Sequence, residues 1–510
     1  MDDRTPVLIG AGQFTYRGPA GQSPSPTRLM KFAADRAVAD AGLAQGILAG
    51  IDGVAMTEFA ADSPGGKAIP HSTNPPATLS KVLGASPKWS VYAHVGGNSP
   101  QHAINLVCER VAQGQNDFVL VIGCEFLGST NKRLAQGLGF DDWEDAEDLP
   151  PPARIGDDRP GVSAYEARHG LNRPINVYPL FENALRARDG RSIADHQQRL
   201  GELFAPFTRV AAANPEAWFP IERTPEELIT VSERNRMVGF PYPKYLNAIM
   251  EVDQSAGVII TSLAKARELG VAADRMVFLH GCADAHDLWN PVDRQNFHSS
   301  PAMRLTGAQA LEMAGIGLAD IGHFDLYSCF PSAVQVGAEE LGLALDDPRG
   351  LTVTGGLPYA GGPGSNYAMH SVVVMMERLR AKPGDYGLVT ANGWYLTKQS
   401  TGIYSTTPPT KPFVRQDTGV IQSQIDALPH PVVIEQPQGR AKIETYTVVH
   451  GRENFMLGIV IGRDEQNRRF VAQTPTDSAT LTSLETSEGV GRTGRVEPGP
   501  PGGKNLFRLD

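Results

Sequence analysis

Short apolar runs alternate with longer segments of helical period in two stretches of the chain, 1–124 and 250–405. In the first stretch, PVLIGAG, WSVYAHV and DFVLVIG read as strands, and the segments between them place apolar residues on one face of a helix, the first capped by Thr27. This alternation is typical of strands joined by crossover helices into a parallel or mixed sheet. We therefore predict an α/β protein whose two halves repeat one plan.

In segment 125–249 the alternation of strand and helix patterns stops, which predicts an insertion between the halves. It holds six acidic residues within Asp141–Asp148, and like charges at that density predict a solvated loop. Further along, Thr224, Pro225 and Glu227 have the spacing of a capping box with proline in the first turn. We expect the insertion to be folded in part.

The last part of the chain loses the helical period. Residues 406–425 form a Pro-rich linker, and 426–510 contain runs with alternating apolar positions, among them Phe455, Leu457, Ile459 and Ile461. We predict a small all-β domain there, built as a barrel.

Length and composition narrow the class of protein. A chain of 510 residues is about three to four times the usual domain size, so it should hold at least two cores. The net charge of −10, without a basic run, argues against a nucleic-acid partner, and the apolar runs are too short to span a membrane. Four scattered cysteines and no basic leader favour the reducing cytoplasm.

Two strand-to-helix turns, 94–101 and 327–335, are the strongest candidates for chemistry. Each would present backbone N–H groups at a helix N-terminus, where an oxyanion is stabilised. The second turn also offers a phenol, a hydroxyl and a thiol from Tyr327, Ser328 and Cys329.

Other candidate sites are weaker. His280, Cys282, Asp284 and His286 alternate along one strand, but alternate positions lie about 6.6 to 6.8 Å apart, too far for one tetrahedral metal ion. We therefore predict no metal site. His94 is either a pocket residue or a core histidine, whereas we expect His169 and His196 and the other histidines on the surface.

The arrangement of motifs resembles the thiolase superfamily, in particular the sterol-carrier-protein thiolases and the thiolase-like proteins of type 1, which carry an additional C-terminal domain. The matching segments cover nearly the whole chain: WSVYAHVGGNSPQHAINLVCERVAQGQNDFVLVIGCE at the nucleophile segment, DQSAGVIITS at the start of the second half, DLYSCFPSAVQ at the NEAF or HDCF loop, TGGLPYAGGPGSNYA at the GHP loop and TANGWYLTK at the CxG loop. The resemblance implies a duplicated thiolase fold, with two βαβαβαββ-type halves in five α-β-α-β-α layers. Residues 426–510 resemble an OB-like barrel.

The departures from this family pattern concern its reactive groups. Gly97 stands at the position of the nucleophilic cysteine, Gly362 at that of the histidine, and Ala391 or Asn392 at that of the second cysteine. Thiolase chemistry needs a thiolate and a base, and glycine supplies neither. Loss of a nucleophile from a cooperating set costs about four to six powers of ten in rate, so we expect thiolysis to be negligible.

The resemblance leaves a set of possible acid, base and oxyanion groups. Cys329 holds the place of a cysteine that serves as acid or base, and Tyr327 replaces an oxyanion-hole residue; its phenol, with an ordinary pKa of about 10, is a donor at neutral pH. Tyr367 and His370 are expected on one face of a helix, as a proton-transfer set. The other predicted site residues are the oxyanion loop and the glycine-rich loop: Gly96, Gly97, Asn98, Ser99, Asn392, Gly361 and Gly362.

The resemblance implies a thiolase-like, acyl-CoA-binding protein of lipid metabolism, related to acetyl-CoA acetyltransferases. The first alternative is a retro-aldol lyase that uses tyrosine on a β-hydroxyacyl-CoA of sterol or fatty acyl type. The second is a non-catalytic acyl-CoA carrier or sensor. A CoA thioester is the expected ligand or substrate, no covalently bound cofactor is predicted, and monomer and homodimer both stay open. Basic residues of the insertion could meet the CoA phosphates: Arg186, Arg188, Arg191, Arg199 and Lys244.

Overall fold

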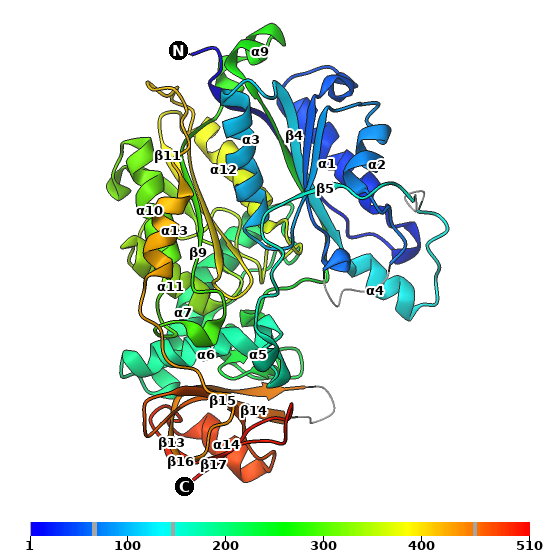
Figure 1. The fold of residues 1–510 in the computed structure, drawn as a ribbon. Helices are drawn as coiled ribbons and strands as arrows, with labels where there is room; N and C mark the ends of the chain where they lie inside the picture. Colours follow the sequence, from blue (N-terminus) through cyan, green and yellow to red (C-terminus); the bar gives the residue numbers. More distant parts are fainter. Residues whose placement is uncertain (1, 64–68, 144–147, 452–455) are drawn as a thin grey trace.

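The computed structural model describes residues 2–63, 69–143, 148–451 and 456–510. Two sheets lie side by side, a helical segment packs below them, and a small β domain stands at the C-terminal end (Figure 1). No helix of the described residues is long and apolar enough to cross a bilayer.

The first sheet holds six strands in the order β1-β8-β4-β2-β3-β5. Its strand β8 was expected to open the second half, but it pairs antiparallel with β1 and with β4. All ten of its residues are buried, so its apolar pattern does not tell one sheet from the other. The two sheets therefore separate after β8 and not at residue 250. The strands are β1 (Pro6–Thr15), β2 (Gly53–Thr57), β3 (Trp89–Ala93), β4 (Phe118–Phe126), β5 (Ala153–Ile155) and β8 (Asp253–Ser262).

The second sheet holds four strands in the order β10-β11-β12-β9. β10 and β11 run parallel, and β12 pairs antiparallel with β11 and β9. The strands are β9 (Phe278–His286), β10 (Ile321–Asp325), β11 (Tyr386–Gly393) and β12 (Lys398–Ser405).

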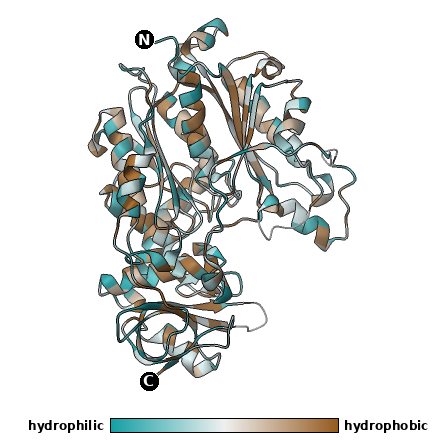
Figure 2. Cartoon of the chain, in the orientation of Figure 1, coloured by the Kyte–Doolittle hydropathy of each residue, from teal (hydrophilic) through white to brown (hydrophobic). Residues whose placement is uncertain are grey.

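Two helices, α3 (Ser99–Ala112) and α12 (Tyr367–Ala381), fill the space between the sheets and contact strands of both (Figure 1). Their buried residues form one apolar cluster with strand residues of the two sheets, which Figure 2 shows as brown central elements. Other helices cover the outer faces, so the layers are α-β-α-β-α. These outer helices are α1 (Pro26–Asp40), α2 (Pro75–Val82) and α9 (Leu263–Glu268) on the first sheet and α10 (Pro301–Ala314), α11 (Pro331–Leu341) and α13 (Thr418–Asp426) on the second.

Of the two predicted helix N-caps, one was wrong and one is confirmed. The cap of α1 is Ser25, whose Oγ accepts from the Arg28 N–H at 3.3 Å, so the prediction of Thr27 was wrong. Proline in the first turn fixes the start of α1 one residue before Thr27. The capping box of Thr224 and Glu227 is present at the start of the helix α8 (Pro225–Ile229).

The insertion is largely helical. Within the acidic run, Trp143 is 4% exposed and donates its indole N–H to the Ser23 carbonyl at 3.2 Å, so the prediction of a solvated loop is wrong there. Aromatic packing against Phe126 and Phe140 outweighs the surrounding charge. Residues 144–147 of the run lie outside the described residues. The helices are α4 (Leu127–Ala135), α5 (Ala164–Arg168), α6 (Pro174–Arg188), α7 (Ile193–Ala213) and α8 (Pro225–Ile229).

The C-terminal domain is a closed five-stranded barrel in the order β13-β14-β15-β17-β16, with β16 returning to β13. A helix, α14 (Ser478–Thr486), lies between the third and fourth strands in sequence, as in an OB-type barrel. The expectation of an all-β segment was incomplete, because the short helix α14 lies between its strands; α13 falls in the predicted linker. The strands are β13 (Gly439–His450), β14 (Met456–Asp464), β15 (Arg469–Gln473), β16 (Thr493–Glu497) and β17 (Leu506–Leu509).

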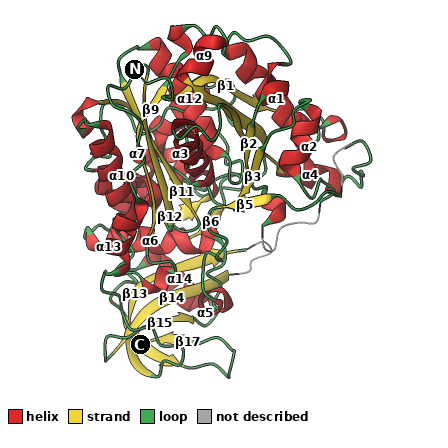
Figure 3. Cartoon of the chain, turned by 45° about the horizontal axis from the view of Figure 1, so that its top comes forward, coloured by secondary structure: helices red, strands yellow, loops and turns green. Residues whose placement is uncertain are grey.

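The barrel is joined to the insertion by backbone pairing and by side-chain contacts, and β6 lies beside the barrel strands in Figure 3. Two short strands of the insertion, β6 (Met237–Gly239) and β7 (Tyr242–Pro243), extend the barrel sheet beside β13. Arg186 of α6 pairs with Glu488 of the barrel domain, and Tyr165 of α5 donates its hydroxyl hydrogen to the Val471 carbonyl at 3.1 Å. The insertion and the barrel therefore pack as one unit beneath the two sheets.

Candidate functional site

The site centres on Gly97, in the loop between β3 and α3. A Cβ atom built on Gly97 would overlap the Tyr327 hydroxyl and would lie 2.5 Å from the Asn392 carbonyl oxygen. The φ angle of Gly97 is outside the left-handed region, so this conflict is purely steric. The space that a nucleophilic side chain would need at this position is occupied by the phenol of Tyr327.

Three side chains fix the loop around Gly97. The Val95 N–H donates to Glu58 at 2.5 Å, and Lys398 Nζ donates to the Val95 carbonyl at 2.6 Å. The Gly96 N–H donates to Ser365 Oγ at 3.2 Å. Glu58 and Ser365 come from segments far apart in the chain, so the loop position depends on both halves.

Two backbone donors of this loop stay unused. The N–H groups of Gly97 and Asn98 have no hydrogen-bond acceptor among the described residues. They stand at the N-terminus of α3, where the helix dipole favours a partial negative charge. Ser99, also in the predicted loop, uses its hydroxyl on the His94 carbonyl at 2.6 Å.

Tyr327 reaches Gly97 from the end of β10. Its hydroxyl makes no hydrogen bond with the described residues, and its ring meets the Tyr367 ring edge-on, with centroids 5.5 Å apart. Burial, together with the nearby Cys329, raises the pKa of Tyr327 well above the ordinary value. The phenol is therefore protonated at neutral pH and acts as a donor.

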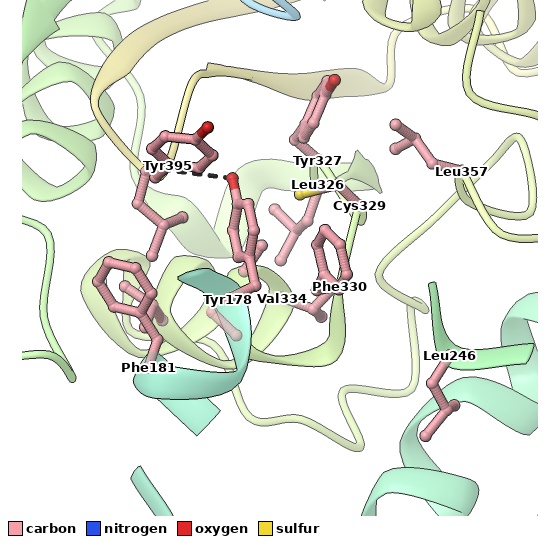
Figure 4. Packing of buried hydrophobic residues seen from close by; sticks show 14 of the residues in the cluster. Tyr178, Phe181, Leu246, Leu326, Tyr327, Cys329, Phe330, Val334, Leu357 and Tyr395 are labelled. Carbon is pink, nitrogen blue, oxygen red and sulfur yellow. Dashed lines mark hydrogen bonds between the residues drawn. The ribbon is translucent and has the colours of Figure 1, made fainter. Parts of the chain in front are cut away.

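Cys329 lies beside Tyr178, a residue of the insertion that we did not predict (Figure 4). The Tyr178 ring stacks on Phe330 at 4.4 Å, and its hydroxyl accepts from Asn392 Nδ2 at 2.8 Å. Burial raises the pKa of the Cys329 thiol to about 12. No motif points to Tyr178; a tyrosine inside the apolar pattern of α6 was the only available signal.

Tyr367 belongs to a buried network around Asp325 at the end of β10. Its hydroxyl shares hydrogen bonds with Thr354 at 2.5 Å and with Asp325 at 3.2 Å. The Asp325 carboxylate also accepts from Ser371 Oγ at 2.8 Å and from backbone N–H groups. Burial raises the pKa of both Tyr367 and Asp325. The network fixes the Tyr367 ring against Tyr327.

His370 does not join this network. Its Nδ1 faces Gln13 of β1 at 2.9 Å, and burial lowers the pKa of the imidazole to about 3. The polar atoms of Tyr367 and His370 share no partner, so the structure does not bring the predicted proton-transfer set together.

The glycine-rich loop is tied to the Cys329 turn by two residues of the insertion. Gly362 donates its N–H to the Ile249 carbonyl at 2.8 Å, and the Ala248 N–H donates to the Cys329 carbonyl at 3.0 Å. The neighbouring Gly361 has φ 110°, and a side chain there would overlap Gln254.

Three of the five basic residues considered for CoA phosphates are already paired. Arg186 is 1% exposed and pairs with Glu488, Arg188 pairs with Glu339, and Arg191 pairs with Asp189. Arg199 and Lys244 make no ion pair with the described residues, and Lys244 is exposed.

Around Gly97, this arrangement offers hydrogen-bond donors, and glycine itself has no nucleophilic side chain. Around Gly97, the Tyr327 hydroxyl and two N–H groups are able to meet an oxygen that carries negative charge. Tyr327, Cys329 and Tyr367 all have raised pKa values, so none of them is an anionic base at neutral pH.

Comparison with known proteins shows which family and which solved structures the chain resembles. Residues 420–499 match the family model "Thiolase-like protein type 1 additional C-terminal domain". A monomeric SCP2-thiolase like protein type 1 from Mycobacterium smegmatis is 37% identical, with a TM-score of 0.85 and 100% of each chain covered. No curated protein sequence matches the chain.

More distant structures share the fold of the two sheets. The Ltp2-ChsH2(DUF35) aldolase is 20% identical with a TM-score of 0.58, and 79% of this chain covers 98% of that one. The acetyl-CoA acetyltransferase from Syntrophomonas wolfei is 15% identical with a TM-score of 0.53, with 79% and 99% covered. These likenesses confirm the predicted thiolase fold with a C-terminal barrel. Since its 37% identity to the mycobacterial protein extends over the whole of both chains, the protein belongs to the SCP2-thiolase-like protein type 1 family.

Proposed function

We propose that the protein binds an acyl-CoA thioester without forming an acyl-enzyme. The observation that carries this proposal is the Tyr327 hydroxyl in the place of the nucleophile, beside Gly97. A covalent acyl group would need a nucleophilic side chain at a position that now has neither the atoms nor the room.

The donors around Gly97 suit the thioester carbonyl oxygen. Tyr327 Oη and the N–H groups of Gly97 and Asn98 lack partners among the described residues, so each is able to donate to a ligand oxygen. Gly97, Tyr327 and Cys329 are buried, so the residues that cover them, Tyr178 among them, have to move when an acyl group enters.

Calorimetry with acetyl-CoA, acetoacetyl-CoA and free CoA tests this proposal. We expect binding of the esters, no acyl adduct in the intact mass, and no acetyl-CoA released from acetoacetyl-CoA and CoA. Tyr327→Phe should weaken ester binding about fivefold to tenfold, because one hydrogen bond to the carbonyl is lost.

Tyr16→Phe is the matched control, since the Tyr16 hydroxyl bonds only to a local carbonyl at 2.8 Å. It should leave ester binding unchanged. A covalent acyl adduct, or no heat with any ester, would overturn the proposal.

Retro-aldol cleavage is the second candidate, favoured by the unpaired Tyr327 hydroxyl. The Tyr327 phenolate would take the proton of the β-hydroxyl, the Cα–Cβ bond would break, and an aldehyde or ketone would leave. The electron pair would pass to the thioester oxygen as an enolate, held by the loop N–H groups until Cα is protonated.

The raised pKa of Tyr327 gives this candidate a distinct pH profile. Because the phenolate is the reactive form, the rate should rise about tenfold per pH unit from neutral pH upward. Mass spectrometry of the released carbonyl compound from β-hydroxyacyl-CoA esters would measure it. A flat profile, or equal activity of Tyr327→Phe, would exclude the mechanism; binding without any turnover leaves a carrier or sensor.

A further inference from the structure

A cavity lies on the side of the Gly96–Gly97 loop that faces Lys398. A side chain at Gly97 would meet Tyr327, whereas a side chain at Gly96 would lie 2.8 Å from Lys398 Cε and Nζ. The cavity on the Lys398 side has a volume of about 350 Å³ and is open to solvent. Its walls include His94, Asn98, His102, Trp289 and Lys398.

Lys398 is a buried cation without a carboxylate partner. Lys398 is 6% exposed. Its Nζ donates to the carbonyl of Val95 at 2.6 Å and to the carbonyl of Asp157 at 3.3 Å. No carboxylate of the described residues forms an ion pair with it. An uncompensated buried charge is unfavourable, and burial lowers the pKa of Lys398 to about 8.

The acids closest to Lys398 are already engaged elsewhere. The Asp157 carboxylate accepts from Arg159, and the Glu58 carboxylate accepts from Arg154 and from the Val95 N–H. Two ammonium protons of Lys398 are used on carbonyls and Nζ lies 5.7 Å from the centroid of the Trp394 ring, but no carboxylate of the described residues is left to pair with it.

The other acid on the cavity wall, Asp284, has hydrogen-bond partners of its own. Its carboxylate accepts from His102 Nδ1 at 3.1 Å, from Asn105 at 3.0 Å and from Arg415 at 2.8 Å. Asp284 therefore has its own partners and does not pair with Lys398.

Further donors and one aromatic face complete the cavity. The His94 imidazole makes no hydrogen bond with the described residues, and the Nε2 of His102 is not used by Asp284. The Trp289 ring is held by Arg159, whose guanidinium carbon lies 3.7 Å from its centroid. Ala93 and Ala285 add apolar surface. A volume of this size exceeds what a single inorganic ion needs.

We propose that this cavity binds a small organic acid, with the carboxylate on Lys398 and His94 and the carbon body against Trp289. The cavity shares the loop residues Asn98 and Ser99 with the Gly97 and Tyr327 site but faces Lys398, and the proposal does not depend on the proposed function. The carboxylate supplies the missing counter-ion of Lys398, and the apolar body accounts for the volume beyond it.

Calorimetry on the full chain tests the proposal with hexanoate and benzoate, their neutral amides, and inorganic phosphate. We expect saturable binding of at least one carboxylate and binding of its amide at least about tenfold weaker, because the charge-assisted bond is lost. Lys398→Met should weaken the carboxylate about tenfold or more, and His94→Ala about threefold to tenfold. Tyr327→Phe should leave carboxylate binding unchanged.

Lys442→Met, at an exposed lysine of β13, is the matched control and should bind like the parent chain. Equal affinity for acid and amide would overturn the proposal, as would parental affinity in both Lys398→Met and His94→Ala. The proposal is also wrong if phosphate alone saturates the protein, or if no carboxylate binds. If Lys398→Met does not fold, His94→Ala and the amide comparison decide.

Discussion

At the scale of residues, the absent nucleophile was visible in the sequence, but what replaced it was not. The resemblance of the motif at 94–101 to the thiolase pattern places Gly97 where a cysteine is expected, and this predicts loss of the thiol. Tyr327 lies far along the chain, and only the folded structure shows that its hydroxyl takes the vacated volume. Tyr178, from the insertion, was equally invisible to motif reasoning.

Two buried histidines also show that the sequence does not reveal contacts between distant segments. His169 and His196 were expected on the surface, but both are fully buried. His196 Nε2 lies 2.6 Å from Glu182, which also accepts from Tyr242 at 2.5 Å. A polar residue is buried when partners from other elements satisfy it, and a linear sequence does not display those partners.

The raised pKa of Cys329 predicts an unreactive thiol. At pH 8 a pKa of about 12 leaves about one thiol in ten thousand ionised, and the thiolate is the nucleophile. Iodoacetamide should label Cys329 at least about a hundredfold more slowly in the folded than in the urea-unfolded chain, as followed by peptide mass mapping. A Ser487→Cys variant, exposed, is the control that reacts at the unfolded rate. Equal labelling of Cys329 in both states would contradict the buried environment.

At the scale of elements, the hydrophobic period of the sequence predicts most strands and helices. It does not predict which strands pair when a strand is fully buried. β8 shows why: a strand buried on both faces carries no alternation that assigns it to a sheet. The helix α13 was missed because it lies in a segment with prolines and only two buried residues.

The central helix α12 gives a prediction about acid stability. The pKa of His370 is about 3 in the folded chain and ordinarily 6.5, so the unfolded chain binds the extra proton between these values. The free energy of unfolding should therefore fall as the pH drops from about 6.5 to 3, by up to about 1.4 kcal/mol per pH unit from this residue. In His370→Gln that contribution should vanish, which urea titrations at pH 7 and pH 4 would measure.

The comparison needs the difference between parent and variant, because buried carboxylates titrate in the same range. His430→Gln, at an exposed histidine, should show no change in that difference. A difference for His370→Gln that is identical at pH 7 and pH 4 would refute the buried neutral imidazole.

Strand β5 gives a prediction about self-association. It pairs with β3 and so covers the edge of the first sheet, which otherwise offers unpaired backbone groups. Arg154→Pro should disrupt β5 and produce dimers at micromolar concentrations in sedimentation velocity. Arg154→Thr removes the ion pair with Glu58 but keeps the strand, and should sediment like the parent chain. A Pro variant that behaves as the parent does would show that β5 does not protect this edge.

At the scale of the whole molecule, the barrel is a packed part of the structure. Arg469 of strand β15 donates to the carbonyls of Val292 and Gln295. Tyr165 of the insertion donates its hydroxyl hydrogen to the Val471 carbonyl at 3.1 Å. The barrel thus fixes the insertion that supplies Tyr178 to the site. The sequence predicted the barrel and the insertion separately, and their contact depends on long-range pairs that no local pattern specifies.

The central claim is that the Tyr327 side chain fills the space of the missing nucleophile, and a double-mutant cycle on Gly97 and Tyr327 tests it most directly. Gly97→Ala should lower the free energy of unfolding by about 1 to 3 kcal/mol, because the new methyl group has no room. In a Tyr327→Ala background the same change should cost at least about 1 kcal/mol less, with the Asn392 carbonyl still nearby. The same cost in both backgrounds, measured by urea denaturation, would contradict the account.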